Sequence, residues 1–207
     1  IGAFFVIWRT FFPMSWYMRR LKSLNKDVQK NAAEVLVKIG KPAVKPLIKV
    51  LTKGDWHVRE YAAKTLGRIG DRRAVEPLTK VLVEERYVHI QEYAAEALVK
   101  IGEPAVESLI EILEQNGRIY IYSIAKAAET LGKIGDKKAT VPLIKVLEDC
   151  KYHDLVREKA AEALGKIGDR RAAEPLLKNL YTIATMSAIV SSRLSVSPSP
   201  ARALDEI

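Results

Sequence analysis

The amino-acid sequence predicts an all-α fold, an α-solenoid of about five stacked helical hairpins. The first observation is an Ile-Gly dipeptide that recurs between residues 27 and 186, with its glycine at Gly40, Gly70, Gly102, Gly135 and Gly168. The second is the sequence around this dipeptide, which recurs with few changes: one copy reads "VREYAAKTLGRIGDRRAVEPL" and another reads "VREKAAEALGKIGDRRAAEPL". The spacings of 30 to 33 residues leave room for one helix, a turn and a second helix.

The first helix of each copy is expected from the spacing of its apolar residues. In the second copy, Val58, Ala62, Leu66 and Ile69 lie at the spacing that places side chains on one face of a helix. The glycine that follows is expected to end this helix, because the residue after the last turn commonly needs a positive φ. An aspartate then follows in three copies and is expected to cap the next element, namely Asp71, Asp136 and Asp169.

A second helix is expected in each copy, from about Ala74 to Leu82 in the second one. Pro77 should lie in its first turn, where the missing N–H group costs little. Each first helix also carries a pair of alanines, at Ala32–Ala33, Ala62–Ala63, Ala94–Ala95, Ala127–Ala128 and Ala160–Ala161. Side chains this small let helices approach closely, so stacking on neighbouring hairpins is expected to cover the apolar faces.

The composition is that of a folded protein without a disulfide framework. The 207 residues are 48% hydrophobic and have a mean hydropathy of −0.04, which is enough apolar material for a sizeable core. Cys150 is the single cysteine, so neither an intramolecular disulfide nor a metal site of paired cysteines can form. This cysteine usage fits a reducing compartment, and we expect a cytoplasmic location.

The net charge of +9 is distributed unevenly along the chain. Residues 1–26 contain five Lys or Arg and no acidic residue, whereas residues 87–118 contain six Glu and two Lys or Arg. A pI of about 9.5 invites a nucleic-acid interpretation. A protein that follows an extended nucleic acid is expected to carry cations along its whole surface, and here an acidic repeat interrupts them.

The residues before the repeats have a different composition. All four Phe and two of the three Trp lie in the first 16 residues. The apolar run there is broken by Arg9 and Pro13 and is shorter than the roughly 20 apolar residues of a membrane span. Three interpretations stay open: a cap on the first repeat, a start translated in error upstream of Met14 or Met18, and an interfacial membrane anchor backed by the basic residues that follow.

We therefore divide the chain into three parts. Residues 1–26 form the aromatic N-terminal segment, and residues 187–207 form a Ser- and Pro-rich tail that we expect to be disordered. The repeat array covers residues 27–186 between them. Its five units are expected at residues 27–54, 55–86, 87–118, 119–152 and 153–186.

The pattern "VREYAAKTLGRIGDRRAVEPL" resembles HEAT-like repeats of the phycobilisome-lyase type, and the resemblance covers about residues 27 to 182. It implies an armadillo-like superhelix whose second helices line a concave face where partners dock. The resemblance indicates a recognition scaffold and singles out no activity, because repeats of this type also occur in bilin lyases and in an iron-dependent hydroxylase that acts on a modified lysine.

The concave face is the expected binding surface. One exposed position of the second helices recurs in every repeat, as Lys49, Lys80, Glu111, Lys145 and Lys178. We call this set the lysine column, and it favours an acidic peptide or an acidic protein as the partner. Tyrosines offer either amphipathic contact area or packing between repeats, at Tyr61, Tyr93, Tyr120 and Tyr122.

A second basic set follows the repeat glycines. This turn ridge consists of Lys41, Arg72, Arg73, Lys137, Lys138, Arg170 and Arg171, and it is interrupted at Glu103. This ridge could bind the phosphates of a nucleic acid, or it could simply be a charged edge exposed to solvent. Arg59 and Arg157 are expected to play a structural part, by pairing with Asp71 and Asp169 of the same repeats.

The sequence contains no glycine-rich phosphate loop and no nucleophile elbow. The candidate metal ligands are His57 with Glu60 and His89 with Glu92, which occupy the same column of consecutive repeats. Metal sites need three or four converging ligands, so we expect no metal and no cofactor. The sequence therefore favours a non-enzymatic protein-binding scaffold, with a lyase-like or metal-dependent oxidoreductase subunit and a nucleic-acid binder as alternatives.

Overall fold

The computed structural model of the protein describes residues 14–85, 87–115 and 119–181, and every regular element in these ranges is helical. The first helices of the five repeats are α3 (Lys26–Ile39), α5 (Trp56–Ile69), α7 (Val88–Ile101), α9 (Ile121–Ile134) and α11 (Asp154–Ile167). The second helices are α4 (Lys41–Lys53), α6 (Val75–Glu84), α8 (Val106–Glu114) and α10 (Thr140–Glu148). Helical residues 173–181 take this place in the fifth repeat.

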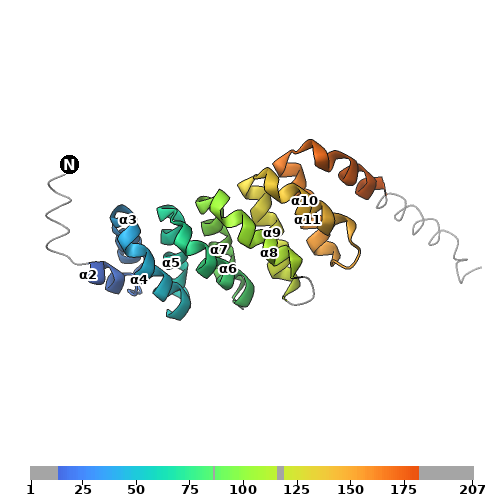
Figure 1. Cartoon of the computed structure of the whole chain (residues 1–207). Helices are drawn as coiled ribbons and strands as arrows, with labels where there is room; N and C mark the ends of the chain where they lie inside the picture. The colour runs from blue at the N-terminus through green and yellow to red at the C-terminus, as the bar shows by residue number, and fades with distance from the viewer. Residues whose placement is uncertain (1–13, 86, 116–118, 182–207) are drawn as a thin grey trace, which may run out of the picture.

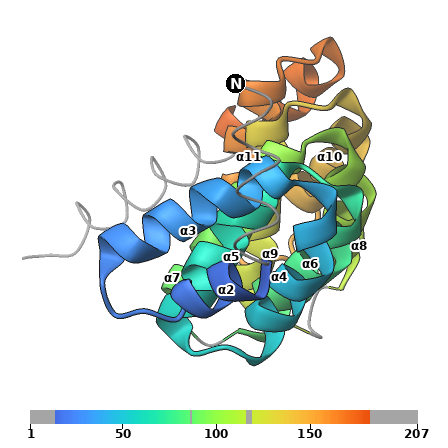
Figure 2. The ribbon, with the colours of Figure 1, turned by 90° about the vertical axis from the view of Figure 1, so that its left-hand side faces the viewer.

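The repeats follow one another along one axis, from α3 near one end to α11 near the other (Figure 1). Seen along that axis, the first helices form one layer and the second helices form another (Figure 2). Within the first layer, α5 packs on α7 and α9 packs on α11, and each second helix also packs on the first helix of the next repeat. The predicted all-α solenoid is confirmed.

The turns between the two helices of a repeat follow the local signals of the sequence. All five repeat glycines have φ between 66° and 78°. The Asp71 carboxylate accepts a hydrogen bond from the backbone N–H of Arg73 at 3.0 Å, and Asp136 and Asp169 do the same in their repeats. These aspartates cap short 3-10 turns that lead into the second helices. Pro77 is the third residue of α6 and lies in its first turn, as expected.

The core lies between the two layers of helices. The alanine pairs are buried, apart from Ala161, which is half-buried. Each layer also contributes buried leucines at recurring positions: Leu36, Leu66, Leu98, Leu131 and Leu164 in the first layer, and Leu47, Leu78, Leu109 and Leu143 in the second. These buried leucines belong to one continuous hydrophobic core, and each contributes about 1.5–3 kcal/mol to stability.

A short helix, α2 (Met14–Arg20), precedes the first repeat and packs on α3. Tyr17 and Leu21 are buried there, and the Gln29 side-chain amide donates a hydrogen bond to the Leu21 carbonyl at 3.0 Å. In the next repeat, Arg59 donates in the same way to the Leu51 carbonyl at 2.7 Å. The helix α2 therefore occupies the place of a second helix ahead of the first repeat.

The interpretations given above for the aromatic segment concern mainly residues 1–13, and those for the tail concern residues 187–207. Both stretches lie outside the described residues. Among the residues that the structure describes, no helix is long and apolar enough to cross a membrane.

Candidate functional site

The lysine column lies on the second-helix layer, and all five of its side chains are exposed. The structure adds a sixth member, Arg19 of α2, which stands two residues before buried Leu21, just as Lys49 stands two residues before buried Leu51. Sequence reasoning missed Arg19 because α2 lacks the repeat pattern. The spacing of eight residues from Leu21 to Gln29, matched by Leu51 and Arg59, is the signal that could have found it. That this layer forms the concave face stays a prediction.

The cations of the column have few internal partners. No carboxylate of the described residues lies within ion-pair distance of Arg19, Lys49 or Lys145. Lys80 has a distant one, since its Nζ lies 3.8 Å from Glu84 of the same helix, and both of these side chains are about two-thirds exposed. Solvent screens such a pair, so most of the positive charge of the column is available to a partner.

The turn ridge differs, because three of its seven cations hold the repeats together. Arg73 donates to the Lys41 carbonyl of the preceding repeat at 3.1 Å, and Arg171 donates to the Lys137 carbonyl at 3.2 Å. Lys138 Nζ lies 2.8 Å from Glu103 of the preceding repeat, the residue that interrupts the ridge.

The hydrogen bonds from the Arg73 side chain and backbone lower the pKa of Asp71 to about 2. The equivalent bonds from Arg171 hold the pKa of Asp169 well below its usual range. Both carboxylates therefore stay charged and keep the two arginines in place. This leaves Lys41, Arg72, Lys137 and Arg170 as the ridge cations without an ion pair among the described residues.

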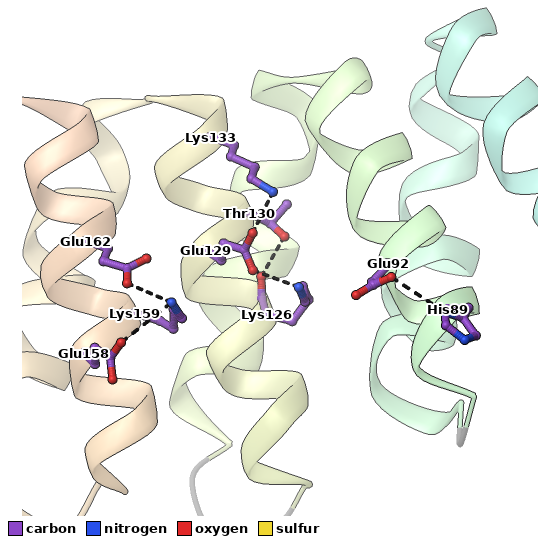
Figure 3. Close-up of polar contacts among 9 residues, drawn as sticks. All are labelled: His89, Glu92, Lys126, Glu129, Thr130, Lys133, Glu158, Lys159 and Glu162. Atoms are coloured by element: carbon purple, nitrogen blue, oxygen red, sulfur yellow. Dashed lines mark hydrogen bonds and ion pairs between the residues drawn. The ribbon is translucent and has the colours of Figure 1, made fainter.

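The outer face of the first-helix layer neutralises its central charges internally (Figure 3). Glu129 lies 2.8 Å from Lys126 and 2.6 Å from Lys133, and Lys159 lies 2.7 Å from Glu162. Burial raises the pKa of Glu129, but the hydrogen bonds from Lys126 and Lys133 outweigh burial and lower that pKa to about 2. These lysines therefore have little uncompensated charge to offer a partner.

The candidate metal ligands do not converge. His89 Nδ1 lies 3.9 Å from Glu92, and the His89 side chain is largely exposed. In the preceding repeat, His57 instead contacts the Trp56 ring edge-on, and Glu60 pairs with Lys64 at 2.6 Å. Across residues 14–85, 87–115 and 119–181, no group of three His, Cys, Asp or Glu residues is placed to hold a metal ion.

Three of the four tyrosines contact lysines of the first-helix layer. Lys64 Nζ lies 4.1 Å from the centre of the Tyr93 ring and 5.8 Å from that of Tyr61, and Lys126 lies 5.4 Å from that of Tyr122. These cation–π contacts join neighbouring side chains within the layer. Tyr120 is exposed instead, at the start of α9.

The expected pairing of Arg59 with Asp71 is wrong, and so is that of Arg157 with Asp169. Arg59 forms an ion pair with Glu85, and Arg157 donates to the Leu147 carbonyl at 3.1 Å. Both arginines therefore face the end of the preceding second helix, where free carbonyl groups and the helix dipole favour a cation.

Comparison with known proteins places these repeats in a family. The family model of HEAT repeats matches residues 16–98, 44–125 and 106–184. A 56-residue stretch is 45% identical to the phycocyanobilin lyase subunit alpha of Picosynechococcus sp. (strain ATCC 27264 / PCC 7002 / PR-6). That stretch is 27% of this chain, and the match spans 21% of the length of the relative.

Two solved structures are similar in outline. The complex of CpcE and CpcF of phycocyanin lyase from Nostoc sp. PCC7120 matches with 26% identity and a TM-score of 0.49, over 81% of this chain and 70% of that one. Human deoxyhypusine hydroxylase matches with 20% identity and a TM-score of 0.40, over 83% of this chain and 77% of that one. Since the HEAT-repeat matches together span most of the sequence and agree with the stacked hairpins, the chain belongs to the HEAT-repeat family.

Proposed function

We propose that the protein is a non-enzymatic scaffold that binds an acidic peptide or an acidic protein surface on its second-helix layer. The observation that carries this proposal is the difference between the two layers. Four lysines of the first layer, Lys64, Lys126, Lys133 and Lys159, are held by glutamates at 2.6–2.8 Å, whereas Arg19, Lys49 and Lys145 of the second layer have no such partner among the described residues.

This difference bears on binding because an internal ion pair must be broken before its cation can serve a partner. A cation that is only hydrated exchanges water for a carboxylate, and several such cations in a row steer and orient an acidic ligand. Successive residues of the column lie one repeat apart. This suits contact with a partner along an extended surface, which is how stacked repeats commonly bind.

The test is a fluorescence-anisotropy titration of the full chain with a labelled peptide in which leucines alternate with pairs of glutamates. Reversal of two column charges, Lys49→Glu with Lys145→Glu, is expected to weaken binding about tenfold or more. Reversal of two ridge charges, Arg72→Glu with Arg170→Glu, changes the net charge equally and serves as the matched control.

Equal losses in both double variants would show that net charge alone drives the binding and would contradict the proposal. A labelled oligonucleotide in the same titration addresses the nucleic-acid alternative. Tight oligonucleotide binding that only the ridge variant loses, with no peptide binding, would favour that alternative.

The identity to a phycocyanobilin lyase subunit favours a second candidate. In that case the chain would be one subunit of a lyase that handles phycocyanobilin. Absorption spectra of phycocyanobilin with and without the full chain test this candidate. A red-shifted, sharpened absorption band that titrates to a fixed stoichiometry would support it, and unchanged spectra would remove it.

A further inference from the structure

A basic groove lies on the second-helix layer between α2 and α4, with a volume of about 500 Å³. Its apolar part is formed by Met14, Met18, Pro46 and Val50. Its charged part is formed by four cations, namely Arg19, Lys22, Lys49 and Lys53, and no carboxylate belongs to its lining. The groove therefore combines a flexible apolar surface with unopposed positive charge.

The groove exists because α2 stands where a second helix would stand. Tyr17 and Leu21 are buried where α2 packs on α3, and Met18 and Arg19 on the exposed flank of α2 line the groove beside α4. No ion pair among the described residues involves any of the four groove cations. Their charge is thus not used by the fold.

Positive charge is concentrated at this end of the layer. At the helix position four residues after the column, α4 has Lys53 where α6 has Glu84. At the position four residues before it, α4 has Lys45 where α6 has Glu76. The same helix face is therefore cationic on α4 and of mixed charge on α6.

We propose that this groove anchors an acidic amphipathic segment of a partner protein, an assignment that rests on the proposed function. An apolar side chain of the segment packs on Met14 and Met18, because methionine adapts to side chains of different shape. Carboxylates on either side of it pair with Arg19 and Lys49. A nucleic acid fits less well, since its phosphates leave the methionine surface uncovered and the lining offers no aromatic ring for a base.

The first experiment compares two double charge reversals in the full chain, using the leucine–glutamate peptide. Arg19→Glu with Lys53→Glu alters the groove, and Lys145→Glu with Lys178→Glu alters the far end of the column by the same net charge. The groove variant is expected to lose about tenfold or more in affinity and the distal variant about threefold or less. Exposed positions are used throughout, so unchanged circular dichroism is the check on folding.

The second experiment detects the contact of the peptide leucines with Met14 and Met18 in the unmodified chain. With methyl-¹³C-methionine labelling, the resonances of Met14 and Met18 are expected to shift when the leucine peptide binds. A peptide in which serine replaces every leucine keeps the charge, and it is expected to bind about tenfold more weakly and to leave these resonances near their free positions.

The outcomes separate this proposal from the proposed function. If the distal reversal abolishes binding while the groove reversal and the methionine resonances show no effect, the acidic partner binds elsewhere on the column and the groove assignment is overturned. If neither peptide binds the unmodified chain, both proposals are overturned. Methionine shifts caused by phosphatidylserine vesicles but not by the peptides would identify an anionic membrane surface instead, and would also overturn the assignment.

Discussion

Gly67 of α5 lies directly against the backbone of Ala97 in α7, so that a Cβ atom on Gly67 would come within 2.6 Å of the Ala97 Cα. Gly132 and Ala163 have the same relationship between α9 and α11, again at 2.6 Å. Gly165 stands at the equivalent position of α11, and a Cβ atom there would meet no atom of another described element within 4 Å. The close approach of these helices therefore depends on glycine at two sites, whereas no described helix approaches the third glycine.

Three glycine-to-alanine variants test this relationship. Gly67→Ala and Gly132→Ala are expected to lower the free energy of unfolding by about 1–3 kcal/mol, because the helices must separate to admit the methyl group. Gly165→Ala is expected to raise it by about 0.5–1 kcal/mol, because alanine is the better helix former and meets no neighbour. Urea denaturation followed by circular dichroism measures all three. The same effect in all three variants would contradict the packing described for α5 and α9.

Arg59 is expected to contribute more to stability than an exposed arginine. It donates to the Leu51 carbonyl and pairs with Glu85, whose side chain is 8% exposed. Arg59→Met should lower the free energy of unfolding by about 1.5–3 kcal/mol, as for the loss of hydrogen bonds to a charged group. Arg68→Met, an exposed position on the same helix, is the control and should change it by about 0.5 kcal/mol or less. Thermal or urea unfolding of both variants shows whether Arg59→Met lowers the free energy of unfolding more than Arg68→Met does.

The ion pairs of Glu129 predict how stability depends on acid. Its pKa falls from the ordinary value of 4.5 to about 2 in the folded protein, so the folded state holds the charged form more strongly than the unfolded state. This stabilisation is present above the unfolded pKa and is lost as pH falls from about 4.5 to about 2.

Glu129→Gln should therefore be less stable than the unmodified chain by about 1–2 kcal/mol near neutral pH and should match it near pH 2. Unfolding midpoints measured over that range test the expectation. Glu111→Gln, which removes an exposed glutamate of the second-helix layer, is the comparison. A stability difference for Glu129→Gln that stays constant across the range would show that these pairs do not account for it.

Sequence periodicity predicted the elements of this fold because their causes are local. A positive φ at Gly70 and the capping by Asp71 depend on residues within one turn, and both are present as expected. The partner of Arg59 could not be predicted in this way. The Leu51 carbonyl belongs to the preceding repeat and Glu85 follows α6 of the repeat that contains Arg59, so both contacts depend on how helices distant in sequence pack together.

The candidate site shows the same division. The position of Lys49, Lys80 and Lys145 on one face of the second helices followed from the repeat period, and the structure places them there, exposed. The position of α2 as a second helix did not follow, because its sequence lacks the Ile-Gly repeat pattern and shares only a few spacings with the repeats, such as that of Arg19 and Leu21. Some cations form contacts between repeats, as Arg73 does when it donates to the Lys41 carbonyl. The sequence of a single repeat does not show which cations these are.

Mapping of backbone amide resonances on the full chain during titration with the leucine–glutamate peptide tests the central claim most directly. The account predicts that the perturbed amides lie on the second-helix layer, from Arg19 and Lys49 outward, and that those around Glu129 on the opposite layer stay unchanged. Perturbations confined to the turns around Arg72 and Arg170, or to the first-helix layer, would contradict it.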